Sequence, residues 1–219
     1  TIWKEPLKVR MRTMVQSLMH KFIVEDSTKC FTAMPDYVLI FTKKGVNEVP
    51  VTHLEGLKKY FGATPILPNI LQAWNNANKS DLNEAQLWDY LNREFKNHKD
   101  PKSNKLSHYI WQRYASSVWD DVRLDNVLPF RDSREEDDEK HVHPLQLDVI
   151  DRLVELYSNE GEVVFTPFMG VGSEVYSPVS LGRKAIGIEL KDSYFKQAKI
   201  NLGDAKYRFE EAAEQKTLF

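Results

Sequence analysis

Apolar residues recur along the chain at two different spacings, and these spacings predict where helices and strands form. The segment after Pro6 has helical spacing, with apolar positions at Leu7, Met11, Met14, Val15, Leu18 and Phe22. A second helix is predicted from about Asp81, which forms a capping box with Glu84. Its apolar face holds Leu87, Trp88, Leu91 and Phe95. Residues 37–43 are β-branched and aromatic, and they predict a strand.

The C-terminal third of the chain predicts a β-α-β unit. A helix from Leu147 to Tyr157 precedes a short strand at 162–165. A second strand at 184–189 follows an intervening helix, and a further helix begins near Asp192. Two strands joined in this way lie parallel and are covered by helices, so we expect an α/β fold.

Composition narrows the class of protein. The chain has 219 residues, 42% of them hydrophobic and 28% charged, which excludes a wholly disordered chain. The formal net charge of −2 gives no global attraction to nucleic acid, so any such contact must come from local basic surfaces. The single cysteine, Cys30, excludes an intramolecular disulfide and a cysteine metal cluster. No apolar stretch reaches the length of a membrane helix, so we expect a cytoplasmic protein without a membrane segment. We also expect no metal site.

An aromatic and basic segment follows the second helix. It runs from His108 to Arg123 and includes Trp111 and Arg113. Aromatic rings beside arginines can stack on an unstacked base and bind the backbone, so Trp111, Arg113 and Arg123 are candidate DNA contacts. The same composition is also typical of the core and rim of a small subdomain, and the sequence leaves both interpretations open.

A glycine-containing loop joins the strand at 162–165 to the next helix. Gly170 and Gly172 permit a tight turn and a close approach of a ligand to the backbone, and the helix N-terminus offers free amides. Glu189 ends the following predicted strand, where a carboxylate can accept hydrogen bonds from both hydroxyls of a ribose. This combination indicates an adenosine-containing cofactor. A glycine turn with a surface glutamate is the alternative.

These segments resemble the cofactor motifs of S-adenosylmethionine-dependent DNA amino-methyltransferases. The resemblance rests on Val164–Ser173 and Ile186–Leu190. His143-Pro144-Leu145-Gln146 resembles the element that precedes the cofactor strand in the permuted, β-group order, and the run from Trp111 to Leu202 is similar to phage-type members. The resemblance implies a Rossmann-like methyltransferase sheet with flanking helices. We expect one partial domain over 1–219, in which 58–125 is a small helical insertion or target-recognition region.

The resemblance also implies a set of binding residues. The methionine part of S-adenosyl-L-methionine is expected at the loop, and the ribose at Glu189. His143 to Gln146 form the far side of the pocket, and double-stranded DNA is the substrate, methylated at adenine N6 in preference to cytosine N4. The loop residues expected to contact the cofactor are Phe165, Thr166, Pro167, Phe168, Gly170, Gly172 and Ser173.

Two departures from the family pattern matter. Thr166 stands where the family usually has Asp, so this position offers no charge to the ammonium group of the cofactor. The chain also lacks any Asp-Pro-Pro-Tyr-like tetrapeptide, the motif that orients the target amine and stacks on the flipped base. The chain starts at Thr1, so we expect a C-terminal, cofactor-binding portion whose catalytic motif comes from an upstream segment or a companion chain.

Two other functions are compatible with parts of this pattern. A non-catalytic module that binds S-adenosylmethionine or DNA would need no tetrapeptide. A nicotinamide-dependent dehydrogenase uses a similar glycine and acid arrangement, but the loop lacks the third glycine of that fingerprint. The amino-methyltransferase interpretation accounts for the most residues.

Overall fold

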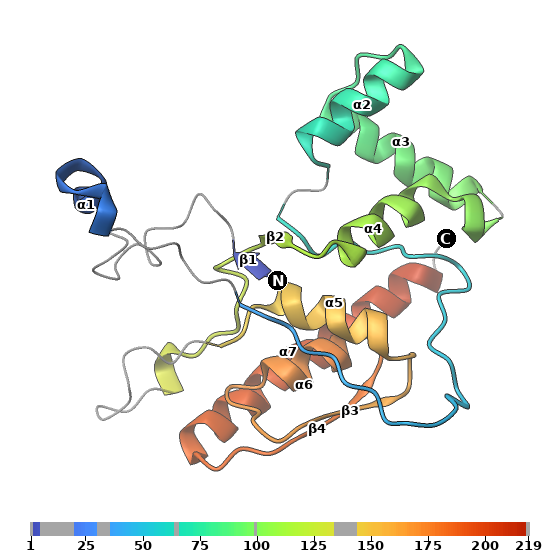
Figure 1. Cartoon of the computed structure of the whole chain (residues 1–219). Coiled ribbons are helices and arrows are strands. Elements are labelled where there is room, and N and C mark those ends of the chain that lie inside the picture. The colour runs from blue at the N-terminus through green and yellow to red at the C-terminus, as the bar shows by residue number, and fades with distance from the viewer. Residues whose placement is uncertain are drawn as a thin grey trace. The chain divides into compact units, whose positions relative to one another are not determined.

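A computed structural model gives the fold of the chain, and its helices and strands are drawn in Figure 1. The structure describes residues 2–4, 20–29, 36–63, 66–98, 100–133 and 144–217. The chain divides into two compact units. The first unit consists of Thr1–Val46 and His53–Leu124, and the second consists of Asn47–Thr52 and Asp125–Phe219. No helix in the described ranges has both the length and the apolar character needed to cross a membrane.

The second unit contains the predicted β-α-β arrangement. Strand β3 (Val163–Thr166) pairs in parallel with β4 (Lys184–Gly187), and helix α6 (Ser173–Ser180) connects them. In the register of this pair Val163 lies beside Lys184 and Thr166 beside Gly187. Helix α6 packs on both strands and on the two flanking helices, α5 (Leu147–Tyr157) and α7 (Asp192–Thr217) (Figure 1). The α/β class predicted from the sequence is confirmed, as are the helices at 147–157 and after 192.

Two apolar clusters form the core of the second unit. Met169 and Val175 pack against Ala198 of α7, so the loop after β3 is anchored to the last helix. The other cluster joins α5, α6 and α7 and lies next to the short helix η5 (Arg131–Ser133). Its buried members are Leu128, Leu147, Val171, Tyr176 and Ala205. These contacts fix the position of the glycine loop at the carboxyl end of β3.

The first unit is mainly helical. It contains α2 (Pro68–Asn78), α3 (Glu84–Asn97) and α4 (Lys105–Ala115). All three helices lie in the segment 58–125, where the sequence predicts a helical region. A short parallel pair, β1 (Ile2–Lys4) with β2 (Trp119–Val122), belongs to the same unit. The remaining short elements are α1 (His20–Glu25), η3 (Ser27–Lys29) and η4 (Pro101–Ser103).

The capping of α3 differs from the prediction. The helix begins at Glu84, and its N-cap is Asn83. The Asn83 side chain accepts a hydrogen bond from the Gln86 N–H at 2.9 Å, and the Gln86 side chain accepts one from the Asn83 N–H at the same distance. The capping box is therefore Asn83 with Gln86, and the predicted pair of Asp81 with Glu84 was wrong. The helix therefore starts three residues later than the predicted start near Asp81.

The predicted strand at 37–43 does not form. Asp36 makes an isolated antiparallel bridge to Ile2, whose N–H donates to the Asp36 carbonyl at 2.8 Å, and no ladder continues from it among the described residues. The apolar side chains that follow are exposed, and Phe41 is 86% exposed. A β-rich sequence becomes a strand only where a second strand satisfies its backbone groups, and here the pairing stops after one bridge. The predicted helix after Pro6 lies mostly outside the described residues.

Candidate functional site

The loop between β3 and α6 depends on two glycines with different roles. Gly172 is the N-cap of α6 and has φ +100°, a conformation that side chains disfavour. A Cβ atom at Gly172 would lie 3.1 Å from the Cβ of Ala198 and 3.2 Å from its Cα, so this glycine lets α7 approach closely. Gly170 has φ +54°, and a Cβ atom there would meet nothing within 4 Å. The backbone at Gly170 is therefore open to a ligand.

Backbone hydrogen bonds to Glu189 hold this loop beside β4. The Gly170 N–H donates to Glu189 Oε2 at 2.8 Å, and the Lys191 N–H donates to Glu189 Oε1 at 2.8 Å. The Met169 N–H donates to the Ile188 carbonyl at 2.9 Å, which continues the β3–β4 pairing into the loop. Glu189 thus fixes the loop through one oxygen and the start of α7 through the other. A carboxylate offers about four lone pairs, so two acceptor positions remain.

Helix α7 holds the far end of the loop. Asn201 is 5% exposed, and its Nδ2 donates to the Val171 carbonyl at 2.8 Å and to the Pro129 carbonyl at 3.3 Å. Gln197 Nε2 donates to Asn201 Oδ1 at 3.0 Å. One buried amide therefore satisfies two carbonyls that come from separate segments, and it ties the segment before η5 to the glycine loop.

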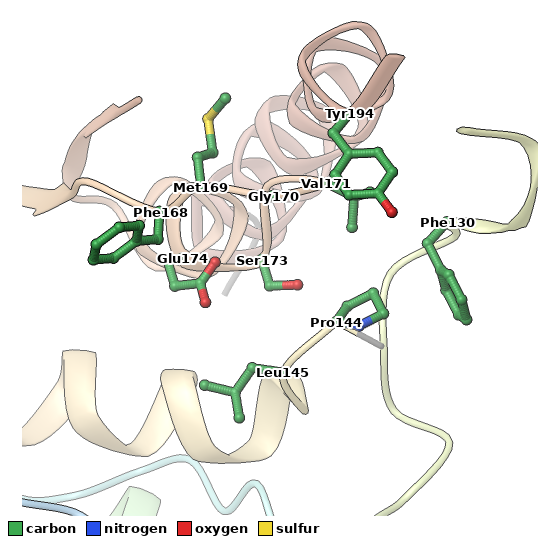
Figure 2. A pocket seen from close by; sticks show the side chains of 10 residues that line it. All are labelled: Phe130, Pro144, Leu145, Phe168, Met169, Gly170, Val171, Ser173, Glu174 and Tyr194. Carbon is green, nitrogen blue, oxygen red and sulfur yellow. The ribbon is translucent and has the colours of Figure 1, made fainter. Parts of the chain in front are cut away.

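A cavity opens beside this loop within the second unit (Figure 2). It has a volume of about 150 Å³ and opens to solvent, so it is smaller than the roughly 300–1,000 Å³ of a complete small-molecule site and can enclose part of a ligand. Most of its wall is apolar, and the polar side chains come from the first turn of α6 and from Tyr194. The lining residues are Phe130, Pro144, Leu145, Phe168, Met169, Gly170, Val171, Ser173, Glu174 and Tyr194.

Ser173 and Glu174 give the cavity its polar groups on α6. Ser173 is 2% exposed, and its hydroxyl has no hydrogen-bond partner among the described residues. Glu174 is partly buried, and burial raises the pKa of its carboxyl group above the ordinary value of 4.5. The one opposing effect is a hydrogen bond from its own backbone N–H, which lowers the pKa. The cavity therefore has a desolvated acid beside an unused hydroxyl.

Several predicted cofactor residues meet at this cavity. Phe168, Gly170 and Ser173 line it together with Pro144 and Leu145 from the predicted far side. His143 lies outside the described residues, and Gln146 is buried at the N-cap of α5 with its Oε1 unpaired within the described part of the chain.

The other predicted cofactor residues do not line the cavity. Thr166 is buried, and its hydroxyl accepts from the Phe168 N–H at 3.2 Å. Phe165 and Pro167 are exposed, Gly172 supports the turn, and Glu189 acts through the Gly170 backbone.

Three of the described lining residues lie outside the loop and the His143–Gln146 element that the sequence analysis singled out. Glu174 follows Ser173 directly and looks like an ordinary acid in the first turn of a helix. Its position next to Ser173 is the one sequence feature that could have indicated a place in the cavity wall. Tyr194 lies in the first turn of α7, five residues after Glu189. Phe130 is far away in sequence, and nothing in its neighbourhood pointed to the cavity.

The three predicted DNA contacts lie in the first unit and differ in exposure. Trp111 of α4 is 57% exposed. Arg113 is only 8% exposed, and its Nη2 pairs with Asp120 Oδ1 at 3.0 Å and with Asp121 Oδ2 at 2.8 Å. Arg123 is partly buried and donates to the Phe61 carbonyl at 3.4 Å.

Arg113 belongs to a buried network and not to a phosphate-binding surface. The Tyr60 hydroxyl donates to Asp121 Oδ2 at 2.6 Å, and Asp121 is buried. Burial first, and then the charge of Asp121, raise the pKa of Tyr60 well above its usual range. The expectation that Arg113 contacts DNA does not fit this position, because its charge is already paired inside the first unit. No group of metal-ligating side chains is found in the described ranges.

Comparisons with known proteins match one family model and several methyltransferases. The family model N6_N4_Mtase, a DNA methylase, matches residues 2–200. The DNA adenine methyltransferase YhdJ of Escherichia coli (strain K12) is 28% identical over 200 residues, which cover 89% of this chain and 61% of YhdJ. The Type II methyltransferase M.MthZI of Methanothermobacter thermautotrophicus is 31% identical over 106 residues, covering 47% of this chain and 28% of that protein.

One solved structure with partial likeness is TTHA0409, a DNA modification methylase from Thermus thermophilus, complexed with S-adenosyl-L-methionine. It is 26% identical, with a TM-score of 0.34 over 52% of this chain and 37% of that chain. By the coverages given above, this chain spans about three-fifths of the length of YhdJ and about a quarter of the length of M.MthZI. Because the family match covers nearly all of its residues, the chain belongs to the DNA methylase family N6_N4_Mtase.

Proposed function

We propose that this chain is the cofactor-binding portion of an S-adenosylmethionine-dependent DNA amino-methyltransferase. The observation that carries the proposal is the cavity at the carboxyl end of β3, with an open glycine backbone and an unused buried hydroxyl. Ligands of open α/β sheets bind at this edge. Membership of the DNA methylase family supports the same assignment.

The residues of the cavity are compatible with this cofactor. Gly170 leaves room for close approach to the backbone, and the Ser173 hydroxyl is available for a hydrogen bond. In the proposal the loop from Thr166 to Ser173 holds the methionine part, and Pro144 and Leu145 provide the apolar wall opposite. Glu189 keeps its two backbone hydrogen bonds and receives the ribose hydroxyls at its remaining acceptor positions.

The cofactor supplies an electrophilic methyl group carried on a sulfonium. The protein contributes orientation and a dry surface. The apolar residues Phe168, Met169 and Val171 limit the access of water, and the glycine loop fixes the backbone around the bound molecule. The chain has no Pro-Pro-Tyr-like tetrapeptide, the motif that orients the target base.

We infer that an upstream segment or a companion chain supplies that tetrapeptide, as in the permuted β-group order. The target in this proposal is adenine N6 in preference to cytosine N4, and the similarity to YhdJ, a DNA adenine methyltransferase, supports this choice. Double-stranded DNA is the partner, and exposed Trp111 and partly buried Arg123 are the candidate contacts kept from the aromatic segment. The phage-type resemblance and a cytoplasmic site of action stay predictions from the sequence.

A methyl-transfer assay tests this function. Labelled S-adenosylmethionine and mixed-sequence double-stranded DNA are incubated with the 219-residue chain, alone and together with the polypeptide encoded upstream of it. The proposal predicts no transfer by the chain alone, and transfer in the mixture that yields N6-methyladenine on nucleoside analysis. Robust transfer by the chain alone would show a catalytic motif within these residues.

The same assay separates the regulatory alternative. A non-catalytic module would bind S-adenosylmethionine or DNA and give no transfer in either mixture. Absence of S-adenosylmethionine binding would refute the proposed function altogether.

Trp111→Ala checks the proposed DNA contact. The variant is tested in the active mixture at several salt concentrations, because stacking on bases depends less on salt than phosphate contacts do.

A further inference from the structure

Glu174 is the only charged residue among the ten described residues that line the cavity. It comes from the first turn of α6, and Figure 2 shows its carboxylate beside the Ser173 side chain. Within the described part of the chain it forms no ion pair. A carboxylate that loses water without gaining a partner is unfavourable, and burial raises its pKa accordingly. Burial therefore makes a negative charge on Glu174 costly at this wall of the cavity.

A role in helix stability alone does not account for this position. An acid in the first turn interacts favourably with the helix dipole when it is solvated, and that interaction favours the charged form. At Glu174 burial has the larger effect, and it favours the neutral form. A solvated acid at the same turn would stabilise α6 without this cost. Its carboxylate lines the cavity, where a ligand can reach it.

Ser173 gives independent support for a polar ligand at this point. Its hydroxyl is almost fully buried and has no hydrogen-bond partner within the described residues. Figure 2 shows this hydroxyl directed toward the space between α6, Pro144 and Tyr194. A buried hydroxyl without a partner is uncommon and costs free energy, so a ligand group that bonds to it would recover that cost.

The position directly before the loop proline is already engaged. Thr166 carries no charge, and its hydroxyl accepts the Phe168 N–H. From these contacts we propose that Glu174 binds the α-ammonium group of S-adenosylmethionine, with the Ser173 hydroxyl as a neighbouring hydrogen-bond partner of the same amino-acid moiety. This inference rests on the proposed function. It moves the cation-binding carboxylate from the end of β3 to the first turn of α6.

Calorimetric titration with three ligands tests the assignment. S-adenosylmethionine carries an ammonium and a sulfonium, S-adenosylhomocysteine carries the ammonium alone, and 5′-methylthioadenosine carries neither. Glu174→Gln should weaken both ammonium-bearing ligands by about 10- to 100-fold, the range expected for a hydrogen bond between charged groups. Binding of 5′-methylthioadenosine should be unchanged. The control Glu48→Gln removes an exposed carboxylate of the second unit and should leave all three affinities unchanged.

The outcomes distinguish this inference from the proposed function. If the unmodified chain binds none of the three ligands, the proposed function fails and the inference fails with it. If the unmodified chain binds them and Glu174→Gln binds S-adenosylmethionine equally well, only the assignment of Glu174 is overturned. Loss restricted to S-adenosylmethionine would overturn it too, because Glu174 would then recognise the sulfonium.

Ser173→Ala provides a second readout that does not depend on methyl transfer. Because the hydroxyl has no partner among the described residues of the ligand-free protein, its removal should leave the thermal midpoint unchanged or raise it. The affinity for S-adenosylmethionine should fall by about 3- to 10-fold, as expected for one neutral hydrogen bond. A lower midpoint with unchanged affinity would show that the hydroxyl is structural and would overturn its part in the site.

Discussion

Replacing Gly172 with alanine tests whether the glycine loop is built as the structure indicates. The substitution places a methyl group on a residue with φ +100° and ψ 15°, at the N-cap of α6. The new Cβ atom would lie 3.1 Å from the Cβ of Ala198 and 3.2 Å from its Cα. One of these contacts is with backbone, so the strain cannot be relieved by rotating a side chain.

The expected loss of stability has two parts. Holding a non-glycine residue in the left-handed region costs about 1–2 kcal/mol. Pressing a methyl group into a packed contact adds about 1–3 kcal/mol. Gly161→Ala is a matched control, because Gly161 also has a positive φ of +82° but a Cβ atom there would meet nothing within 4 Å. Gly172→Ala should therefore be less stable than Gly161→Ala by about 1–3 kcal/mol, the packing part alone.

Thermal unfolding of both variants gives the measurement. For a chain of this size the packing part corresponds to a difference of roughly 2–12 °C between their midpoints. Urea unfolding should give the same order, with equal slopes for the two variants. Equal midpoints would refute the reasoning, because they would show that α7 does not lie against the loop at Gly172.

Three further predictions follow from other contacts of the two units. Arg113→Ala should destabilise the chain by about 3–5 kcal/mol in urea unfolding, because it removes the ion pair between Arg113 and the buried Asp121. A loss below about 1 kcal/mol is typical of an exposed ion pair and would contradict the burial of Arg113. Asn201→Ala should cost about 1–3 kcal/mol, since it strands the Val171 carbonyl, and unchanged urea unfolding would contradict that contact. Burial raises the pKa of Glu174, so its contribution to stability is present at low pH and is lost as pH rises from about 4.5 through the raised value. Glu174→Gln should remove that part of the pH dependence of stability and raise the thermal unfolding midpoint of the ligand-free chain at neutral pH. If the unfolding midpoints of variant and parent change in parallel with pH, the desolvation of Glu174 is contradicted.

Local patterns predicted the second unit well. The β3–α6–β4 arrangement follows from two short apolar runs, two glycines and an acid, all close together in sequence. The helix from Leu147 to Tyr157 agrees with its apolar spacing at both ends. In each case the residues that determine the element are close together in sequence, so the local sequence is enough to predict it.

The failures share a dependence on distant residues. The burial of Arg113 requires Asp121 together with Tyr60, which is 61 residues from Asp121, and composition alone makes the arginine look like a DNA contact. The segment 37–43 has strand-like residues, but strand formation depends on a partner elsewhere. Glu174 resembles an ordinary first-turn acid until the cavity wall is assembled from Phe130, Leu145 and Tyr194.

The central claim is that S-adenosylmethionine binds at the glycine loop of the second unit. Its most direct test is an NMR titration of the isotope-labelled chain with S-adenosylmethionine, following the backbone amides. We predict saturable shifts at Gly170, Ser173 and Glu174, which line the cavity, and none at Trp111 on α4. Saturable shifts centred on α4, or no saturable shift at the loop, would contradict the claim.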